Sequence, residues 1–305
     1  MKKYLWGILY GLFLTVFTAY VLLDTFLITR VYTTVPSDDE SINYVVENDE
    51  DSSTLEEGNS SPMITASSYT DDNITITINE YRENDTTVYV ADVKLSSAEY
   101  LKTAFAKSAY GKNVTEKTSE IADDNNAILA INGDYYGAQE KGYVLRNGVL
   151  YRSTSDGEQE DLVIYTDGSF EIIQEKNISA ASLLDNGAEQ ILSFGPALVL
   201  NGQIAVTEDE EVGKAMTDNP RTAIGIIDNL HYVLVVSDGR TDESDGLTLY
   251  ELSEFMMSIG AETAYNLDGG GSSTMVFNGE IINNPTTNGN KIKERSVSDI
   301  VYIGY

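Results

Sequence analysis

The sequence predicts an α+β fold: a large mixed, mostly antiparallel sheet with a few packed helices, preceded by one N-terminal transmembrane helix. Short runs of β-branched and aromatic residues alternate with Asn-Gly and Asp-Gly pairs, which are typical of hairpin turns. The 24 Gly, 20 Tyr and only 5 Pro also favour strands joined by turns. Helical spacing of apolar residues occurs in few places, so strands are expected to dominate.

A long apolar run opens the chain. Residues 5–28 form a run of 24 (28 − 5 + 1), and a membrane-spanning helix needs about 20. A signal peptide is the alternative, but its apolar region is about 7–15 residues long and a small-residue cleavage site follows it. No such site follows residue 28, so the sequence favours an uncleaved anchor over residues 1–35. Lys2 and Lys3 predict a cytoplasmic N-terminus and an extracellular C-terminal domain.

Residues 36–66 are predicted to be an acidic, disordered linker. From Pro36 to Pro62 the chain is rich in Asp, Glu and Ser and has no Lys or Arg. Such a segment cannot bury enough apolar surface to fold, and its like charges repel one another. The globular domain is therefore expected over residues 67–305.

Within this domain, alternation and short apolar runs predict the individual elements. The expected strands cover 74–78, 88–95, 127–131, 232–236, 264–267, 274–277 and 300–303. Segments 98–109 and 114–123 are expected to be helical or partly so. Apolar residues at helical spacing from Leu249 to Ile259 predict a helix that ends at Gly260. Tight turns are expected at Asn147-Gly148, Asp167-Gly168, Asn201-Gly202 and Asn278-Gly279.

Charge and composition exclude several kinds of function. The 49 Asp and Glu residues outnumber the 19 Lys and Arg residues, which gives a net charge of −30 and makes nucleic acid a poor partner. A phosphate-bearing substrate would therefore need a local group of arginines. The absence of Cys excludes thiolate catalysis and Cys-ligated zinc. The one histidine, His231, begins an apolar strand, and no Gly-x-Ser-x-Gly motif accompanies it.

Candidate site residues gather where predicted strands end, which is where rigid scaffolds present functional groups. Three adjacent glycines, Gly269 to Gly271, precede Ser272, Ser273 and Thr274. Exposed backbone N–H groups in such a turn would suit an anion, although a wide hairpin turn explains the glycines equally well. Three carboxylates, from Asp134, Asp238 and Asp268, could serve glycoside cleavage, which uses paired carboxyl groups. Asp238-Gly239 also fits a simple turn.

Five motifs occur in one order: 130–136 (AINGDYY), 220–225 (PRTAIG), 238–240 (DGR), 266–274 (NLDGGGSST) and 294–299 (ERSVSD). Together, over about residues 70–305, they resemble the phosphodiester glycosidase family, which includes bacterial exopolysaccharide biosynthesis-type proteins. The resemblance implies an α+β fold and hydrolysis of a sugar-1-phosphodiester, with an N-acetylglucosamine-type sugar. Where many members have Asn-Gly-Gly-Phe-Phe, this chain has Asp134 at the third position, which leaves its role the least secure.

The resemblance also implies the site residues. Asp268, Asp134 and Asp238 become the catalytic candidates. The expected substrate-binding residues are Asn132, Arg221, Arg240, Asn266, Gly269, Gly270, Ser272, Ser273, Thr274 and Arg295. Arg221, Arg240 and the glycine turn are expected to hold phosphate, and Asn132 and Asn266 to bind sugar hydroxyls. Arg295 is expected either to bind substrate or to brace Asp268.

The expected function is therefore hydrolysis of sugar phosphodiesters in cell-envelope glycans or teichoic-acid-like polymers. A non-catalytic glycan-binding protein and a metal-dependent phosphodiesterase that cuts the P–O bond are the alternatives. No cofactor and no metal site are expected, while the sequence leaves open a divalent cation bound by carboxylates. The expected partners are the carbohydrate substrate and the membrane; the sequence does not indicate an oligomeric state.

Overall fold

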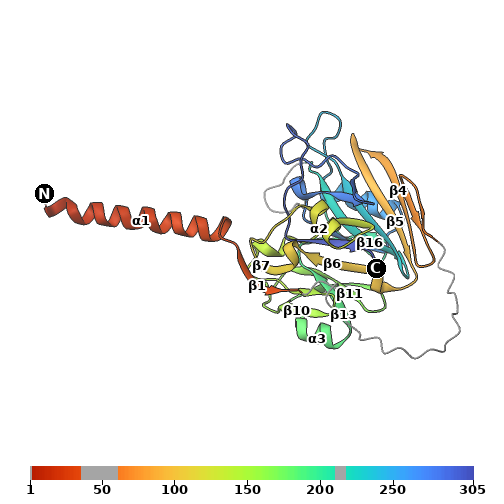
Figure 1. Cartoon of the computed structure of the whole chain (residues 1–305), viewed down its shortest axis with the longest axis horizontal. Helices are drawn as coiled ribbons and strands as arrows, with labels where there is room; N and C mark the ends of the chain where they lie inside the picture. Colours follow the sequence, from red (N-terminus) through yellow and green to blue (C-terminus); the bar gives the residue numbers. More distant parts are fainter. Residues whose placement is uncertain (1, 36–60, 210–217) are drawn as a thin grey trace, which may run out of the picture.

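The computed structural model describes residues 2–35, 61–209 and 218–305. Helix α1 (Lys2–Phe26) projects away from the folded domain (Figure 1). Its segment Trp6–Phe26 has a mean hydropathy of 1.9 and no part of it is buried, so it is long and apolar enough to cross a membrane. Most of the predicted linker, residues 36–60, lies outside the described residues.

Short strands lie at both sides of the linker. Strand β1 (Arg30–Thr34) pairs antiparallel with β7 (Ala109–Lys112), which connects the end of the apolar helix to the domain. Strand β2 (Met63–Ile64) pairs with β3 (Ser68–Thr70) at the edge of the largest sheet. The domain boundaries drawn from the sequence stay a prediction.

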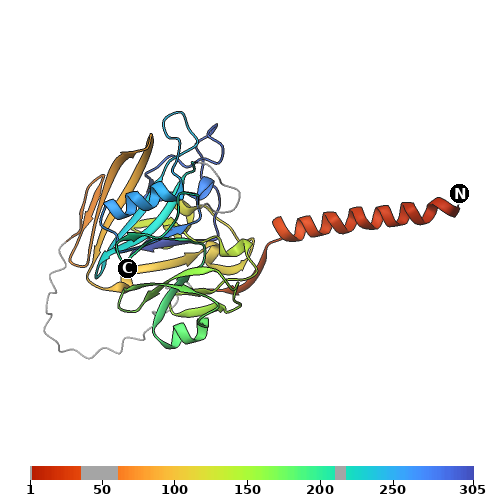
Figure 2. The same cartoon turned by 180° about the vertical axis from the view of Figure 1, so that it is seen from behind.

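Antiparallel sheets form the domain, which confirms the predicted α+β class. The largest sheet has nine strands in the order β15 (Gln203–Ile204), β14 (Ala197–Leu200), β18 (Thr263–Leu267), β16 (Arg221–Asp228), β17 (His231–Ser237), β5 (Thr86–Leu95), β4 (Ile74–Glu83), β3 and β2. Strands β4, β5 and β16 are seen on the right of Figure 1 and from behind in Figure 2.

Two five-stranded sheets complete the architecture. One has the order β20 (Glu280–Ile281), β19 (Met275–Phe277), β8 (Leu129–Asn132), β21 (Asp299–Ile303) and β6 (Leu101–Phe105). The other has the order β10 (Val149–Arg152), β9 (Val144–Arg146), β13 (Ala188–Leu192), β11 (Glu160–Tyr165) and β12 (Phe170–Gln174). Residues of all three sheets meet in one apolar core, where Val93, Ile131 and Leu162 are fully buried.

The helices cover the outer faces of these sheets. Helix α4 (Leu249–Ser258) begins at a capping box between Thr248 and Glu251, as its N-terminal sequence requires. Its apolar side packs on the nine-stranded sheet, and the chain then turns at Gly260, where φ is +92°. Helices α2 (Thr118–Asp124) and α3 (Ala180–Asp185) cover one five-stranded sheet each.

One sequence prediction is wrong. Residues 98–109 are not a helix: a 3₁₀ turn, η2 (Ala98–Tyr100), leads into β6, and a second one, η3 (Ala106–Ser108), follows it. Alternate residues of β6 are buried against the core, so pairing with β21 outweighs local helix propensity. Three Asn-Gly hairpins are confirmed, because Asn147, Asn201 and Asn278 all have positive φ. Asp167-Gly168 also lies in the turn between β11 and β12, but there only Gly168 has positive φ.

A buried carboxyl in the second five-stranded sheet should make stability depend on pH. Both oxygens of Asp161 are buried without a hydrogen-bond partner. Burial, and then the charge of Glu175, raise the pKa of Asp161 to about 9. The folded state therefore keeps a proton that the unfolded chain releases above about pH 4, so the free energy of unfolding falls as pH rises towards 9.

We expect Asp161→Asn to weaken this dependence by up to about 1.4 kcal/mol per pH unit between pH 5 and 8. Urea unfolding of the variant and the parent at pH 5, 6.5 and 8 measures it. Parallel stability curves for the two proteins would contradict the protonation of Asp161 in the folded state.

Candidate active site

The predicted polar clusters converge where three central strands of the nine-stranded sheet, β16, β17 and β18, start or end. Arg221 starts β16 and is paired with Ser237 at the end of β17, directly before Asp238. Thr222 is paired with Leu267 at the end of β18, directly before Asp268. In an antiparallel pair, one strand starts beside the point where its neighbour ends. Residues from three distant segments therefore become neighbours here.

Asn132 joins this edge to the end of strand β8. Its amide donates to the carbonyl of Asp268 at 2.6 Å, and its side-chain oxygen accepts from the Thr222 hydroxyl at 2.9 Å and the Thr274 N–H at 3.2 Å. The side chain is fully buried. These contacts favour a positioning role for Asn132 over the predicted sugar contact, which stays a prediction.

Asp268 is a partly accessible carboxyl group at the centre of the site. Its side chain is 13% exposed and forms an ion pair at 3.2 Å with Arg295, whose guanidinium also donates to Ser272 Oγ at 2.6 Å. Burial raises the pKa of Asp268, and the charge of Arg295 opposes that shift. The alternative that Arg295 braces Asp268 matches this geometry.

The triple glycine forms a tight turn, η5 (Gly270–Ser272), beside Asp268. Gly270 has φ of +62° and donates its N–H to the Pro220 carbonyl at 2.7 Å. The N–H groups of Ser272 and Ser273 also donate to carbonyls of the turn. Most donors are therefore used internally, so the turn is not an open anion nest, and any phosphate binding rests on side chains.

Three arginines lie within electrostatic reach of one another beside this turn. Arg240 donates to Asn219 Oδ1 at 2.6 Å and to the Thr287 carbonyl at 2.6 Å. Burial, and then the charges of Arg295 and Arg221, lower the pKa of Arg240. Like charges this close repel one another, and a bound anion would relieve that repulsion. The local positive site expected from the sequence is therefore present.

Gly271 is required by a close approach rather than by its own dihedral angles. A Cβ at this position would lie 2.4 Å from Thr287 Oγ1 and 3.2 Å from Thr287 Cα. We expect Gly271→Ala to push the 283–295 loop outwards, at a cost of about 1–3 kcal/mol in stability. Thermal unfolding measures this, and Thr287→Ala in the same chain should restore part of the loss. Gly7→Ala, which meets nothing within 4 Å, is the matched control.

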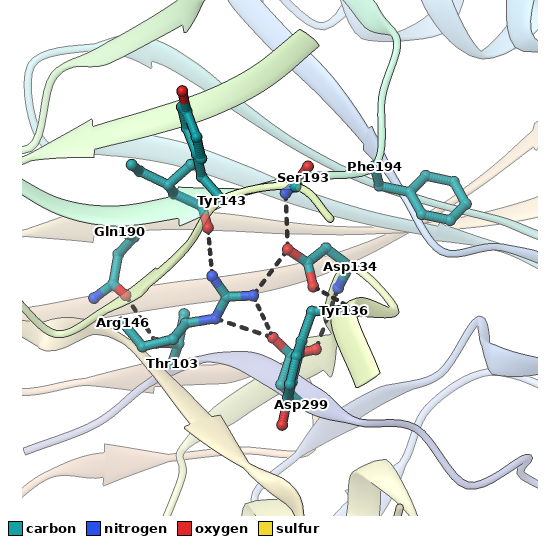
Figure 3. A network of polar contacts seen from close by, with 12 residues as sticks. Thr103, Asp134, Tyr136, Tyr143, Arg146, Gln190, Ser193, Phe194 and Asp299 are labelled. Carbon is teal, nitrogen blue, oxygen red and sulfur yellow. Dashed lines mark hydrogen bonds and ion pairs between the residues drawn. The ribbon is translucent and has the colours of Figure 1, made fainter. Parts of the chain in front are cut away.

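Asp134 lies in a buried ion-pair network and not in the open site (Figure 3). Arg146 Nη2 lies 2.8 Å from Asp134 and 2.7 Å from Asp299, and all three side chains are at most 2% exposed. Asp134 also accepts from the N–H groups of Tyr136 and Ser193. These contacts favour a structural role for Asp134, and the predicted catalytic role has no support in this geometry.

Asp238 also has its oxygens committed to the backbone and to amides. It accepts from the Asn284 N–H at 2.8 Å, from the Asn284 side chain at 3.0 Å and from the Asn283 side chain at 3.3 Å. It is 3% exposed. Asp238 therefore holds the 283–295 loop against the site, and its catalytic role stays a prediction.

Three polar atoms of the glycine-turn motif are buried without a hydrogen-bond partner among the described residues: Asn266 Oδ1, Ser273 Oγ and Thr274 Oγ1. An unpaired buried polar atom costs about 1–3 kcal/mol, so such atoms in a site are candidates for water or ligand contacts. The predicted binding roles of these residues, and of Gly269, remain predictions.

Sequence reasoning missed several residues that build the site. Asn219 and Thr287 hold Arg240, and Arg146 fixes the end of β21 next to the site. Their side-chain types carry no catalytic signal, so only their spatial neighbours reveal them. His231, by contrast, pairs with Asp92 at the other end of β17, away from Ser237. In the described part of the chain, no group of three or more His, Asp or Glu side chains is placed to hold a metal ion.

A cavity of about 430 Å³ opens beside Arg295. It is lined by Lys117, Thr287, Asn288, Lys291, Lys293, Glu294, Arg295 and Ser296. This volume lies within the range of about 300–1,000 Å³ that is usual for ligand sites. Its lysines were not singled out from the sequence, because no motif contains them.

Comparison with known proteins agrees with this architecture. A sequence profile of the phosphodiester glycosidase family matches residues 125–304, which is more than half of the chain. The zebrafish N-acetylglucosamine-1-phosphodiester alpha-N-acetylglucosaminidase catalytic domain, auto-inhibited by its pro-peptide, superposes with a TM-score of 0.60 at 20% identity, over 76% of this chain and 83% of that one. A hypothetical protein from Synechocystis superposes with a TM-score of 0.55 at 14% identity, over 76% of this chain and 62% of that one.

Sequence relatives point the same way. The prophage-derived uncharacterized protein YomE of Bacillus subtilis is 28% identical over 203 residues, covering 65% of this chain and 31% of the relative. The mouse N-acetylglucosamine-1-phosphodiester alpha-N-acetylglucosaminidase is 31% identical over 159 residues, which cover 48% of this chain and 30% of the relative. The chain thus spans about a third of the length of these relatives.

The α+β fold built from antiparallel sheets matches that of the zebrafish catalytic domain. The profile match identifies the family. The chain belongs to the phosphodiester glycosidase family.

Proposed function

We propose that this protein hydrolyses a bond between the anomeric carbon of an N-acetylglucosamine-type sugar and a phosphodiester in cell-envelope glycans or teichoic-acid-like polymers. The observation that carries the proposal is Asp268: a partly accessible carboxyl with a raised pKa, paired with Arg295 and placed beside Arg240 and Arg221. Family membership and the named mouse relative support the reaction class.

In the proposed reaction, Asp268 acts on the sugar and the arginines act on the leaving phosphate. Asp268 acts in its ionised form on the sugar, either as base for a water molecule or as nucleophile at the anomeric carbon. The bond from the anomeric carbon to the phosphate oxygen breaks, and the phosphate leaves with both bonding electrons. The arginines stabilise the charge that develops on the leaving phosphate. Water supplies the hydroxyl of the free sugar and the proton of the phosphomonoester.

The proposed location follows from helix α1. Because Trp6–Phe26 is apolar and unburied, it can anchor the chain in the membrane. Lys2 and Lys3 favour a cytoplasmic N-terminus, which puts the domain outside the cell among envelope polymers. No cofactor is proposed.

Product analysis tests this proposal. The full-length protein in detergent is incubated with N-acetylglucosamine 1-phosphate linked to glycerol, and the products are identified by mass. Free N-acetylglucosamine with glycerol phosphate is the expected result. Sugar phosphate with free glycerol would show P–O cleavage and overturn the proposal. Binding without turnover would assign the protein as a glycan-binding member of the family.

A further inference from the structure

The cavity beside Arg295 has a charge opposite to that of the molecule. Four of the chain's 19 Lys and Arg residues line it: Lys117, Lys291, Lys293 and Arg295. Among the acidic residues that the structure describes, only Glu294 does so. The Glu294 carboxylate accepts from the Ser119 N–H at 3.0 Å and the Ser119 hydroxyl at 2.6 Å, so it is committed to the start of helix α2.

Two of these cations carry their charge unopposed. Within residues 2–35, 61–209 and 218–305, no carboxylate lies within ion-pair distance of Lys291 or Lys293. Lys117 differs, because it pairs with Glu120. Two unpaired lysines beside Arg295 would attract an anion to this cavity.

The loop that carries these lysines is fixed to the active site. The Lys293 N–H donates to the Pro285 carbonyl at 2.7 Å, and the Thr286 hydroxyl donates to the Lys291 carbonyl at 3.0 Å, which closes the loop on itself. Arg240 holds the same loop through the Thr287 carbonyl at 2.6 Å. The backbone that carries both lysines is therefore fixed beside Arg240.

We propose that this cavity is a second anion subsite, which binds a further phosphate on the leaving-group side of the substrate. The inference rests on the proposed function: Arg295 lines the cavity and also contacts Asp268, so a substrate with its sugar at Asp268 extends its leaving group past Arg295. Lys291 and Lys293 then contact the next phosphate along. The preferred substrate class is accordingly a polymer or oligomer with repeated phosphates, which should react faster than a diester with a neutral leaving group.

A matched pair of substrates tests the subsite. Both contain N-acetylglucosamine 1-phosphate; in one the leaving group is glycerol, and in the other it is glycerol carrying a terminal phosphate. The variant is Lys291→Gln with Lys293→Gln. Its kcat/KM on the phosphorylated leaving group should fall about fivefold or more, while that on the glycerol substrate changes by less than about twofold. Raising the salt concentration should lower kcat/KM more for the substrate with the phosphorylated leaving group than for the glycerol substrate.

A control variant removes the same charge elsewhere. Lys94→Gln with Lys176→Gln changes two exposed lysines, and both kcat/KM values should stay within about twofold. Lys94 lies at the His231 end of β5, and Lys176 pairs with the exposed Glu158. An equal fall on both substrates in the Lys291/Lys293 variant, or no fall on either, would overturn the subsite.

A binding measurement separates failure of the subsite from failure of the proposed function. If the unchanged protein hydrolyses neither substrate, the proposed function falls, and calorimetry with glycerol 3-phosphate still decides the subsite. Loss of that binding in the Lys291/Lys293 variant, but not in the Lys94/Lys176 variant, supports it. Equal binding by the two variants overturns it.

Discussion

Replacing Asp268 by Asn should abolish hydrolysis and leave ligand binding in place. The carboxyl is 13% exposed and paired with Arg295, and an amide oxygen can still accept from that arginine. An amide cannot act as base or nucleophile, so we expect kcat to fall by about 10³-fold. Turnover of the glycerol-linked substrate measures the loss, and calorimetry with N-acetylglucosamine 1-phosphate measures binding.

The pH profile supplies a second readout of Asp268. Burial raises the pKa of this carboxyl, so activity that needs its ionised form should fall, as pH decreases, at a higher pH than for an ordinary aspartate. The charge of Arg295 opposes that shift, so Arg295→Gln should move the acidic limb to still higher pH. A limb that stays in place would show that Asp268 is not the titrating group.

Asp185→Asn is the matched control for the Asp268 variant. This carboxyl is exposed at the end of α3, so the same change of charge should leave kcat within about twofold. A variant lacking the Asp268 carboxyl that retains full activity would remove the catalytic assignment.

Replacing Arg146 by Ala should destabilise the domain by about 3–5 kcal/mol. Arg146 is 2% exposed and is the shared partner of Asp134 and Asp299, so its loss leaves two carboxylates buried without their counter-ion (Figure 3). It also removes the hydrogen bond that Arg146 donates to the Ile191 carbonyl of β13. Urea unfolding at pH 7 measures the change.

A surface arginine provides the comparison. Arg82 is exposed on β4, and among the described residues it donates to Thr87 and to the Glu243 carbonyl. Arg82→Ala should therefore cost no more than about 1 kcal/mol. Adding Asp134→Asn and Asp299→Asn to Arg146→Ala should recover part of the stability, because the unpaired charges are then gone. Equal stability of the Arg146 and Arg82 variants would contradict the structural role of the network.

The sequence predicted which residues gather at the site, but not which of its carboxylates are structural and which is exposed to substrate. Motif order indicated Asp134, Asp238 and Asp268 alike, since each follows an apolar run and precedes a turn. Burial and hydrogen bonding separate them: two carboxylates hold backbone and loops, and Asp268 is accessible. No local pattern contains this information, because the partners, such as Arg146 and Asn284, belong to other segments.

What the sequence by itself determined is local or compositional. The apolar length of α1, the Asn-Gly turns and helix α4 with its cap and terminal glycine follow from residue chemistry within a few positions. The need for a cation cluster followed from the net charge of −30.

Tertiary structure alone decided the remainder, because strand pairing depends on residues far apart in the chain. The middle of segment 98–109 becomes strand β6 since β21 pairs with it, about 200 residues later. The same long-range pairing aligns Arg221, Asp238 and Asp268 at one sheet edge and folds the 283–295 loop against them. The lysine-lined cavity therefore exists only in the folded chain.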